Sequence, residues 1–306
     1  MKRVDGFLVL DEILGLKAIQ DFENIEDWET FFNENANVTV VKSYYNRQIV
    51  LSFEYEGKKY FWKYEKSINP YNELVAAEIA EDLKIPHVSY DLACIGMVNG
   101  IISKDFKISD ADYIDGEKIL QGQYDSSPTT THNNLDDIWY ALEYRYNKEE
   151  NMQEIVGNIM MKLVQVFIFD ILTGQNDRHS SNWGVVEQDG KEPDLQILYD
   201  NAHILSLNYI PAISKVALQT YGNEKSYLED DLLSFLCDSN IEFVKMIYDS
   251  LWVINEENLR SIFKRIETKI GNKMPQIDKE IYINKFAEQK DYIMEIIEKA
   301  KKGKSK

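Results

Sequence analysis

The chain has 306 residues, of which 44% are hydrophobic and 12% aromatic, and it carries 34 basic against 52 acidic side chains, for a net charge of −18. This length suffices for a large buried core and, at roughly 100–200 residues per domain, predicts two domains. The acidic balance excludes tight nonspecific binding to nucleic acid, because such binding depends on neutralising phosphates with Lys and Arg. We therefore expect no direct contact with nucleic acid.

The cysteines and the apolar stretches bear on location. Cys94 and Cys237 are isolated, which excludes a disulfide framework or the spacing of a zinc site and favours a reducing compartment, the cytoplasm. Acidic residues interrupt the apolar N-terminus, unlike the continuous core of a signal peptide. The longest apolar stretch, Met160 to Leu172, is broken by Lys162 and Asp170. It falls short of the ~20 apolar residues of a membrane span, so we expect no membrane association.

The first predicted elements are strands. Residues 38–50 predict a hairpin that turns near Asn46, and strands 51–55 and 59–64 flank the turn at 56–58. Alternation along the last strand places Phe61 and Lys63 on one face and three aromatic residues on the other. Lys63 is thus a lysine in a largely aromatic strand. The competing interpretation is a solvated edge-strand lysine, because long side chains readily reach water from half-buried strands.

A helix is predicted next, over residues 71–83 after Pro70. Glu73 and Glu78 both border its apolar stripe, and periodicity does not choose between them. Strands 88–96 and 100–106 follow, with Asn99-Gly100 as the predicted turn. Residues 1–105 therefore predict a β-rich domain with one helix, and residues 110–134 predict a polar, turn-rich connection.

Helices dominate the remaining chain, which we assign to a helical domain over residues 106–306. Apolar residues recur at helical spacing in six segments: 135–146, 151–173, 229–238, 241–250, 256–269 and 279–302.

A loop rich in polar residues follows the second of these helices. Asp177 and Asn182 lie five residues apart on it, and apolar runs at 183–186 and 195–199 predict a hairpin that returns Asp200 to the side of Asn182. Pairing 182 with 200 also pairs 187 with 195, and cross-strand neighbours lie close enough to share one ion. An amide and a carboxylate oxygen suit Mg²⁺. The competing interpretation is a plain Asn/Asp/Ser turn.

The pattern Asp177-Arg178-His179-x-x-Asn182, followed by Tyr199-Asp200, resembles the catalytic and metal-binding segments of the HipA-like serine/threonine kinases, and the phosphoinositide kinases carry a similar segment. The resemblance implies that Asp177 accepts the substrate hydroxyl proton and that Asn182 and Asp200 hold Mg²⁺. Ordinary protein kinases differ, since they have His-Arg before the aspartate and Asp-Phe-Gly in place of Tyr199-Asp200-Asn201.

The same resemblance implies an α+β, bilobal protein kinase-like fold. A small β-rich N-lobe (1–105) and a larger helical C-lobe (106–306) would bind ATP in the cleft between them. Lys63 would contact the α- and β-phosphates. An Asn-Glu pair opening the helix, as in Asn72-Glu73 here, favours Glu73 over Glu78 as the carboxylate that holds this lysine.

The hairpin that would cover the phosphates contains no glycine between residues 38 and 50. Lys42, Ser43 and Arg47 are its predicted phosphate contacts, and Ser103, at the junction of the lobes, is a further predicted nucleotide contact. In HipA-like kinases this hairpin can carry a regulatory phosphorylated serine, for which Ser43 is the nearest candidate.

These features predict an ATP- and Mg²⁺-dependent kinase that phosphorylates Ser or Thr of a protein, with autophosphorylation and an antitoxin-like regulator as further expectations. Two alternatives stay open: a lipid or small-molecule kinase, and a nucleotide-binding module with little catalysis. Residues 201–231 contain no basic cluster that could bind the anionic headgroup of an inositol lipid, which disfavours the lipid alternative.

Arg178 has two interpretations, a salt bridge that fixes the loop or a surface residue. His179 is expected to support the loop by hydrogen bonding.

Overall fold

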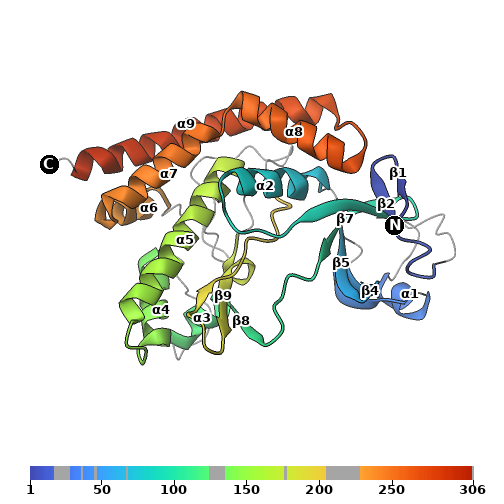
Figure 1. Ribbon diagram of the computed structural model, residues 1–306, viewed down its shortest axis with the longest axis horizontal. Helices are drawn as coiled ribbons and strands as arrows, with labels where there is room; N and C mark the ends of the chain where they lie inside the picture. Colours follow the sequence, from blue (N-terminus) through green and yellow to red (C-terminus); the bar gives the residue numbers. More distant parts are fainter. Residues whose placement is uncertain are drawn as a thin grey trace. The chain divides into compact units, whose positions relative to one another are not determined.

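The computed structural model describes residues 1–16, 28–35, 37–44, 47–66, 68–123, 135–175, 178–204 and 228–304 (Figure 1). The chain divides into two compact units, each built from separated segments. The first comprises Met1–Ile79, Val88–Lys107 and Arg260–Lys279, and the second comprises Ala80–His87, Ile108–Leu259 and Glu280–Lys306. A β-sheet forms most of the N-terminal region and helices form most of the C-terminal region, which confirms the predicted α+β class.

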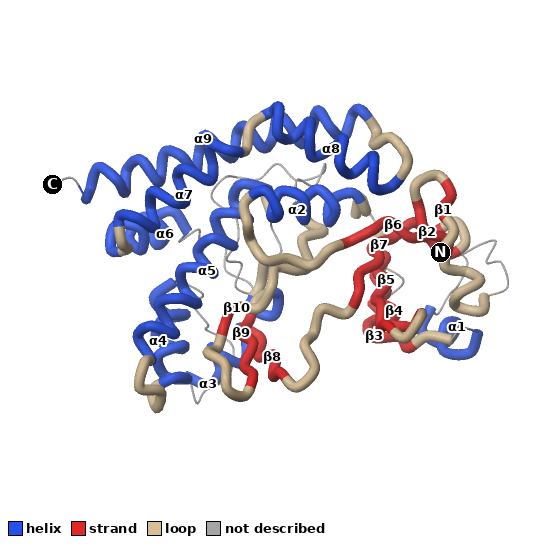
Figure 2. The backbone as a smooth tube through the Cα atoms, in the orientation of Figure 1, coloured by secondary structure: helices blue, strands red, loops and turns tan. Residues whose placement is uncertain are grey.

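One sheet organises the first unit. Its strand order is β1-β2-β6-β7-β5-β4-β3, and all neighbours are antiparallel except β2 and β6 (Figure 2). The strands are β1 (Arg3–Val4), β2 (Phe7–Val9), β3 (Thr39–Tyr44), β4 (Gln48–Tyr55), β5 (Lys58–Glu65), β6 (Tyr90–Ile95) and β7 (Val98–Lys104). Strands β4 and β5 confirm the predicted pair and its turn at Glu56-Gly57.

The core of this unit covers one face of the sheet. Trp62, completely buried, lies in it together with Leu51 of β4, and helix α1 (Trp28–Asn35) adds Trp28 and Phe32. The indole nitrogen of Trp62 donates to the carbonyl of Ala93 at 3.1 Å, so its polar atom is satisfied inside the core. Because side chains alternate along β5, Lys63 belongs to the opposite face.

The predicted turn at Asn99-Gly100 is wrong. Ile95 pairs with Val98, so the chain turns at Gly96, whose φ is 57°, while Gly100 pairs with Ala93 inside β7. A β-carbon on Gly100 would lie 2.4 Å from the carbonyl oxygen of Lys63 and 2.9 Å from the Trp62 ring. This glycine therefore permits close packing of β5, and its place in the sequence does not mark a turn.

Helical segments complete the first unit. Helix α2 (Tyr71–Asp82) begins where predicted, and the unit also takes in the end of α8 (Glu256–Ile270) and the start of α9 (Gln276–Lys304). Arg265 of α8 contacts Glu78 at 2.7 Å, and Lys269 donates to the carbonyl of Tyr90 at 2.6 Å. Helical residues far along the chain thus pack with the N-terminal sheet and α2 in one unit.

The second unit contains a smaller sheet of order β10-β9-β8. Strands β8 (Ala111–Asp115), β9 (Gly184–Gln188) and β10 (Asp194–Leu195) are antiparallel, and helix α3 (Gly116–Gln123) follows β8 directly. The prediction of a polar, turn-rich connection over 110–134 is therefore wrong for its first half, which forms a strand and a helix. The polar sequence of β8 fits an edge strand whose side chains stay partly exposed.

The other helices of the chain agree closely with the periodicity. They are α4 (Leu135–Tyr146), α5 (Met152–Thr173), α6 (Leu228–Asp238) and α7 (Ile241–Val253), with α8 and α9 as given above. Figure 1 shows α4 alongside α5. Among the described residues α5 is the helix long and apolar enough to span a membrane, and 72% of its most apolar window is buried inside the protein. Burial on this scale is typical of a core helix.

Candidate active site

Lys63 lies in a row of four residues that cross the first sheet. Lys42, Val50, Lys63 and Ile101 face one another on β3, β4, β5 and β7. Because directly paired residues share a face, Lys42 and Lys63 project from the same side of the sheet. The row runs from an exposed lysine at the edge to a buried isoleucine inside.

The Glu65 carboxylate lies beside Lys63, two residues along the same strand and on the same face. The Lys63 Nζ lies 3.6 Å from Glu65 Oε2, and the side chains keep 15% and 18% exposure. Gln48 donates to that same carboxylate oxygen at 2.9 Å. Glu73, on α2, is 2% exposed. The sequence did not single out Glu65, and the predicted pair of Lys63 with Glu73 stays a prediction.

The other predicted nucleotide contacts occupy different positions on the sheet. Ser103 pairs with Phe61 and therefore shares the Lys63 face. Ser43 pairs with Ile49, a core residue, and belongs to the opposite face, which does not support a phosphate site shared with Lys63. Arg47 is exposed at the turn between β3 and β4.

In the second unit, the polar loop after α5 leads into a short 3-10 helix, η2 (Ser180–Asn182). His179 precedes it, and its Nδ1 accepts from the backbone amide of Ser181 at 3.3 Å. The ring nitrogen thus caps the helix, as expected for a residue that supports the loop. Asn182 is 7% exposed. Asp177 lies outside the described residues, so its predicted role stays a prediction.

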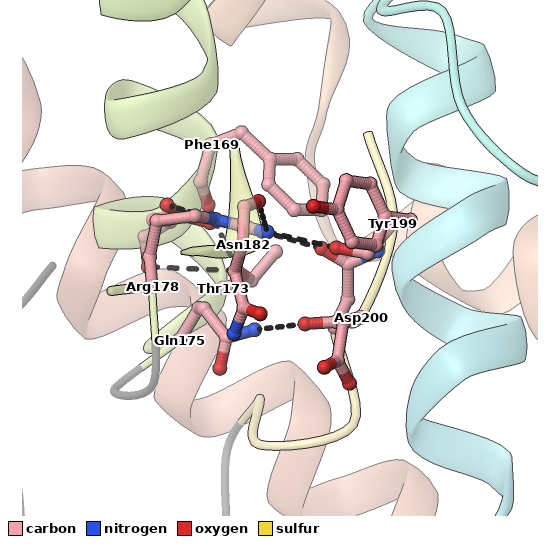
Figure 3. A network of polar contacts seen from close by, with 9 residues as sticks. Phe169, Thr173, Gln175, Arg178, Asn182, Tyr199 and Asp200 are labelled. Carbon is pink, nitrogen blue, oxygen red and sulfur yellow. Dashed lines mark hydrogen bonds and ion pairs between the residues drawn. The ribbon is translucent and has the colours of Figure 1, made fainter. Parts of the chain in front are cut away.

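Arg178 forms the centre of this site (Figure 3). Its side chain and that of Asp170 are both fully buried, with Nε and Nη2 each 3.0 Å from a carboxylate oxygen. Nη1 donates to the carbonyl oxygens of Asn182 at 3.0 Å and Tyr199 at 2.8 Å, and Nη2 donates to Asn201 Oδ1 at 2.6 Å. Of the two interpretations left open by the sequence, the structure shows the salt bridge.

Arg178 and Asp170 each stabilise the charged form of the other. Burial by itself lowers the pKa of Arg178, but the Asp170 carboxylate outweighs it, and the arginine pKa lies above its ordinary value. Burial raises the pKa of Asp170, and Arg178 opposes that shift. Burial also raises the pKa of Tyr199 to about 12. The guanidinium therefore stays charged, and the Tyr199 hydroxyl, which donates to the carbonyl of Ser181 at 2.9 Å, stays protonated.

Asp200 follows the hairpin with an uncommon backbone conformation. Its φ is 55°, in the left-handed region, and its carbonyl accepts from Gln175 Nε2 at 2.9 Å. The expected strand register is wrong by two residues, since Leu195 pairs with Val185 and β10 ends there. A shift of two keeps the same side chains on each face.

The amide of Gln196 still donates to the carbonyl of Gly184 at 2.9 Å, and beyond it the chain leaves its partner strand. Leu198 forms a parallel bridge with His87, and its amide donates to the carbonyl of Pro86 at 2.8 Å. Asp200 therefore reaches the side of the polar loop through Arg178 and Gln175, and hairpin pairing does not place it there.

Asn182 and Asp200 fit a magnesium ion by their chemistry. One nitrogen of Arg178 bonds to both the Asn182 and the Tyr199 carbonyls, so the two segments adjoin. Amide and carboxylate oxygens are hard ligands, and Mg²⁺ takes most of its shell from phosphates and water. Within the described ranges, no group of three or more His, Cys, Asp or Glu side chains gathers as an all-protein cage would require.

Sequence reasoning missed three members of the network: Asp170, Gln175 and Asn201. One signal was available for Asp170, since an aspartate within an apolar helix is rarely buried without a partner, and Arg178 follows eight residues later. Gln175 and Asn201 make tertiary contacts that no local sequence pattern predicts.

Two solved kinase structures share the fold of this chain. The Helicobacter pylori proinflammatory kinase CtkA matches with a TM-score of 0.61 and 18% identity, over 85% of this chain and 94% of that one. HipA of Shewanella oneidensis, solved with HipB and its operator DNA, matches with a TM-score of 0.50 and 15% identity, over 88% of this chain and 67% of that one. The predicted fold is therefore confirmed.

Sequence comparison gives no corresponding result. No protein-family model matches the chain, and no curated protein sequence matches it.

Proposed function

We propose that this chain is a HipA-like kinase that transfers the γ-phosphoryl group of ATP, with Mg²⁺, to a serine or threonine of a protein. One observation carries the proposal: in a chain with this fold, a fully buried guanidinium joins the segments that bear Asn182 and Asp200. Positioning and charge neutralisation supply most of the catalysis in phosphoryl transfer, and a rigid pair of metal ligands serves both.

Each predicted residue has a role in the proposed reaction. Asn182 and Asp200 hold the magnesium ion, which when bound neutralises charge on the β- and γ-phosphates. Lys63 contacts the α- and β-phosphates and Glu73 holds it. The substrate hydroxyl oxygen bonds to the γ-phosphorus as the bond to the β-phosphate oxygen breaks, ADP leaves, and Asp177 takes the hydroxyl proton.

Partners and location follow from the same proposal. The HipA structure contains HipB and operator DNA. Of these two partners we propose only the first kind for this chain, an antitoxin-like protein regulator, because a net charge of −18 disfavours direct binding to nucleic acid. Two isolated cysteines favour the cytoplasm. Autophosphorylation in the hairpin of residues 42–48 is a further proposal.

The acceptor class can be tested with ATP labelled in the γ-phosphate. The purified chain is incubated with labelled ATP, Mg²⁺ and a cell lysate, and the products are separated into protein, lipid and small molecules. We expect Mg²⁺-dependent label in protein that disappears with a chelator. Label in the lipid extract would instead identify a lipid kinase, and nucleotide binding without any transfer would identify a binding module.

A further inference from the structure

We propose that Arg178 and Gln175 are positioning residues that hold the two predicted metal ligands in their binding arrangement before metal and nucleotide arrive. The proposal rests on the proposed function, because it concerns the same magnesium site. Neither residue needs to contact the ion. Each acts on the backbone that carries Asn182 or Asp200.

The first step is the donor count of Arg178. A guanidinium has five N–H donors in a planar fork. Here Nε has one acceptor and the two terminal nitrogens have two each, so every donor meets an oxygen at 2.6–3.0 Å. Two of these bonds anchor the arginine to Asp170 in α5, and the other three reach the two ligand segments. A lysine has three donors around one nitrogen and cannot span these positions.

The second step is where those three bonds end. Arg178 holds the carbonyl of Asn182 itself, the carbonyl of Tyr199, and the side chain of Asn201. Tyr199 and Asn201 are the chain neighbours of Asp200. One predicted ligand is therefore held through its own peptide group, and the other is held on both sides. Figure 3 shows the bonds that join Arg178 to Asn182 and Tyr199.

The third step concerns the backbone of Asp200. Its φ of 55° is a conformation that costs free energy in a residue with a β-carbon, so surrounding contacts must maintain it. Gln175 supplies one such contact, because its Nε2 donates to the Asp200 carbonyl at 2.9 Å. Gln175 is itself fully buried just after α5. The backbone from which the Asp200 carboxylate extends is thus held by these contacts.

Two substitutions test this inference separately from folding. Gln175→Met keeps a side chain of similar size and removes the donor, and Arg178→Lys keeps the charge and removes the fork. Binding of Mn²⁺ with a non-hydrolysable ATP analogue is followed by electron paramagnetic resonance, on variants that circular dichroism shows to be folded. Loss of an outer contact to metal ligands typically lowers metal affinity by roughly 10–100-fold. We expect a loss in that range for both variants, with a raised apparent KM for Mg²⁺.

A matched control is Arg145→Lys. Arg145 also forms a two-pronged pair, with Glu187 at 2.7 and 2.9 Å, but it lies at a partly exposed site on α4. This variant should bind Mn²⁺ like the wild-type chain. If Gln175→Met, which removes the donor to the Asp200 carbonyl, also binds Mn²⁺ like wild type, the inference is overturned. If the wild-type chain binds no Mn²⁺ with the nucleotide, the proposed function fails first, so the two failures are distinguishable.

Discussion

Arg178 and Lys63 are both cationic side chains in segments with predicted functions, yet they are held in opposite ways. Arg178 is fully buried and uses every donor on oxygens of its own chain. Lys63 keeps 15% exposure and lies 3.6 Å from Glu65, beyond hydrogen-bond distance. Arg178 joins its neighbours by short, buried hydrogen bonds, whereas the contact of Lys63 with Glu65 is longer and partly exposed.

The difference follows from the chemistry of the two side chains. A planar fork loses little freedom for each bond that it makes, while an ammonium on a flexible four-carbon stem changes partners easily. The proposed nucleotide site would combine both kinds: ligands that stay fixed and a lysine that adjusts. We therefore expect stability to depend on the Arg178 network and turnover to depend on Lys63.

The largest expected effect is on stability, from Asp170→Asn. The change leaves Arg178 buried without its countercharge, and breaking a buried pair in this way costs about 3–5 kcal/mol. Urea unfolding followed by circular dichroism measures the loss.

Glu187→Gln is the matched control, because the Arg145–Glu187 pair is similar in geometry but keeps 33% and 29% exposure. It should cost less than about 1 kcal/mol. If Asp170→Asn and Glu187→Gln lowered the free energy of unfolding equally, the comparison would fail. Burial would then not determine how much an ion pair contributes to stability.

A smaller effect on stability is expected from Lys63→Met. This substitution removes the partly exposed ion pair with Glu65, so the free energy of unfolding should fall by less than it does for Asp170→Asn. Nucleotide affinity and phosphoryl transfer should fall, as measured by calorimetry and by label transfer.

Lys59→Met is the control for that variant, since Lys59 lies on the same strand with 50% exposure and contacts Asp105 at 3.8 Å. It should keep both properties. A Lys63→Met variant that binds and transfers normally would remove Lys63 from the proposed site.

Much of the fold was predictable because its local patterns are strong. The periodicity of α4, α5 and α2 and the alternation in β4 and β5 fixed these elements to within a residue or a few. The prediction for Asn99-Gly100 failed because glycine serves both turns and close packing, and only the neighbouring Trp62 distinguishes the two. Strand β8 and helix α3 were missed because their sequence is polar and short.

The site was predictable only in part, for a different reason. Asn182 and Asp200 were identified by residue type and spacing, and the structure shows that their segments adjoin. The predicted cause was hairpin pairing, however, and the actual cause is Arg178 with Asp170 and Gln175. These contacts depend on the tertiary arrangement after α5. Lys63 was identified as well, but its contact with Glu65 depends on rotamers that a strand pattern does not specify.

The most direct test of the central claim is phosphoryl transfer by Asp177→Ala, beside Asp189→Ala as a control at an exposed turn. Removing a general base typically lowers the rate by roughly 10²–10⁴-fold. We predict that Asp177→Ala binds ATP with Mg²⁺ but transfers phosphate to protein slower by this factor, while Asp189→Ala matches wild type. Transfer by Asp177→Ala at the wild-type rate would contradict the account.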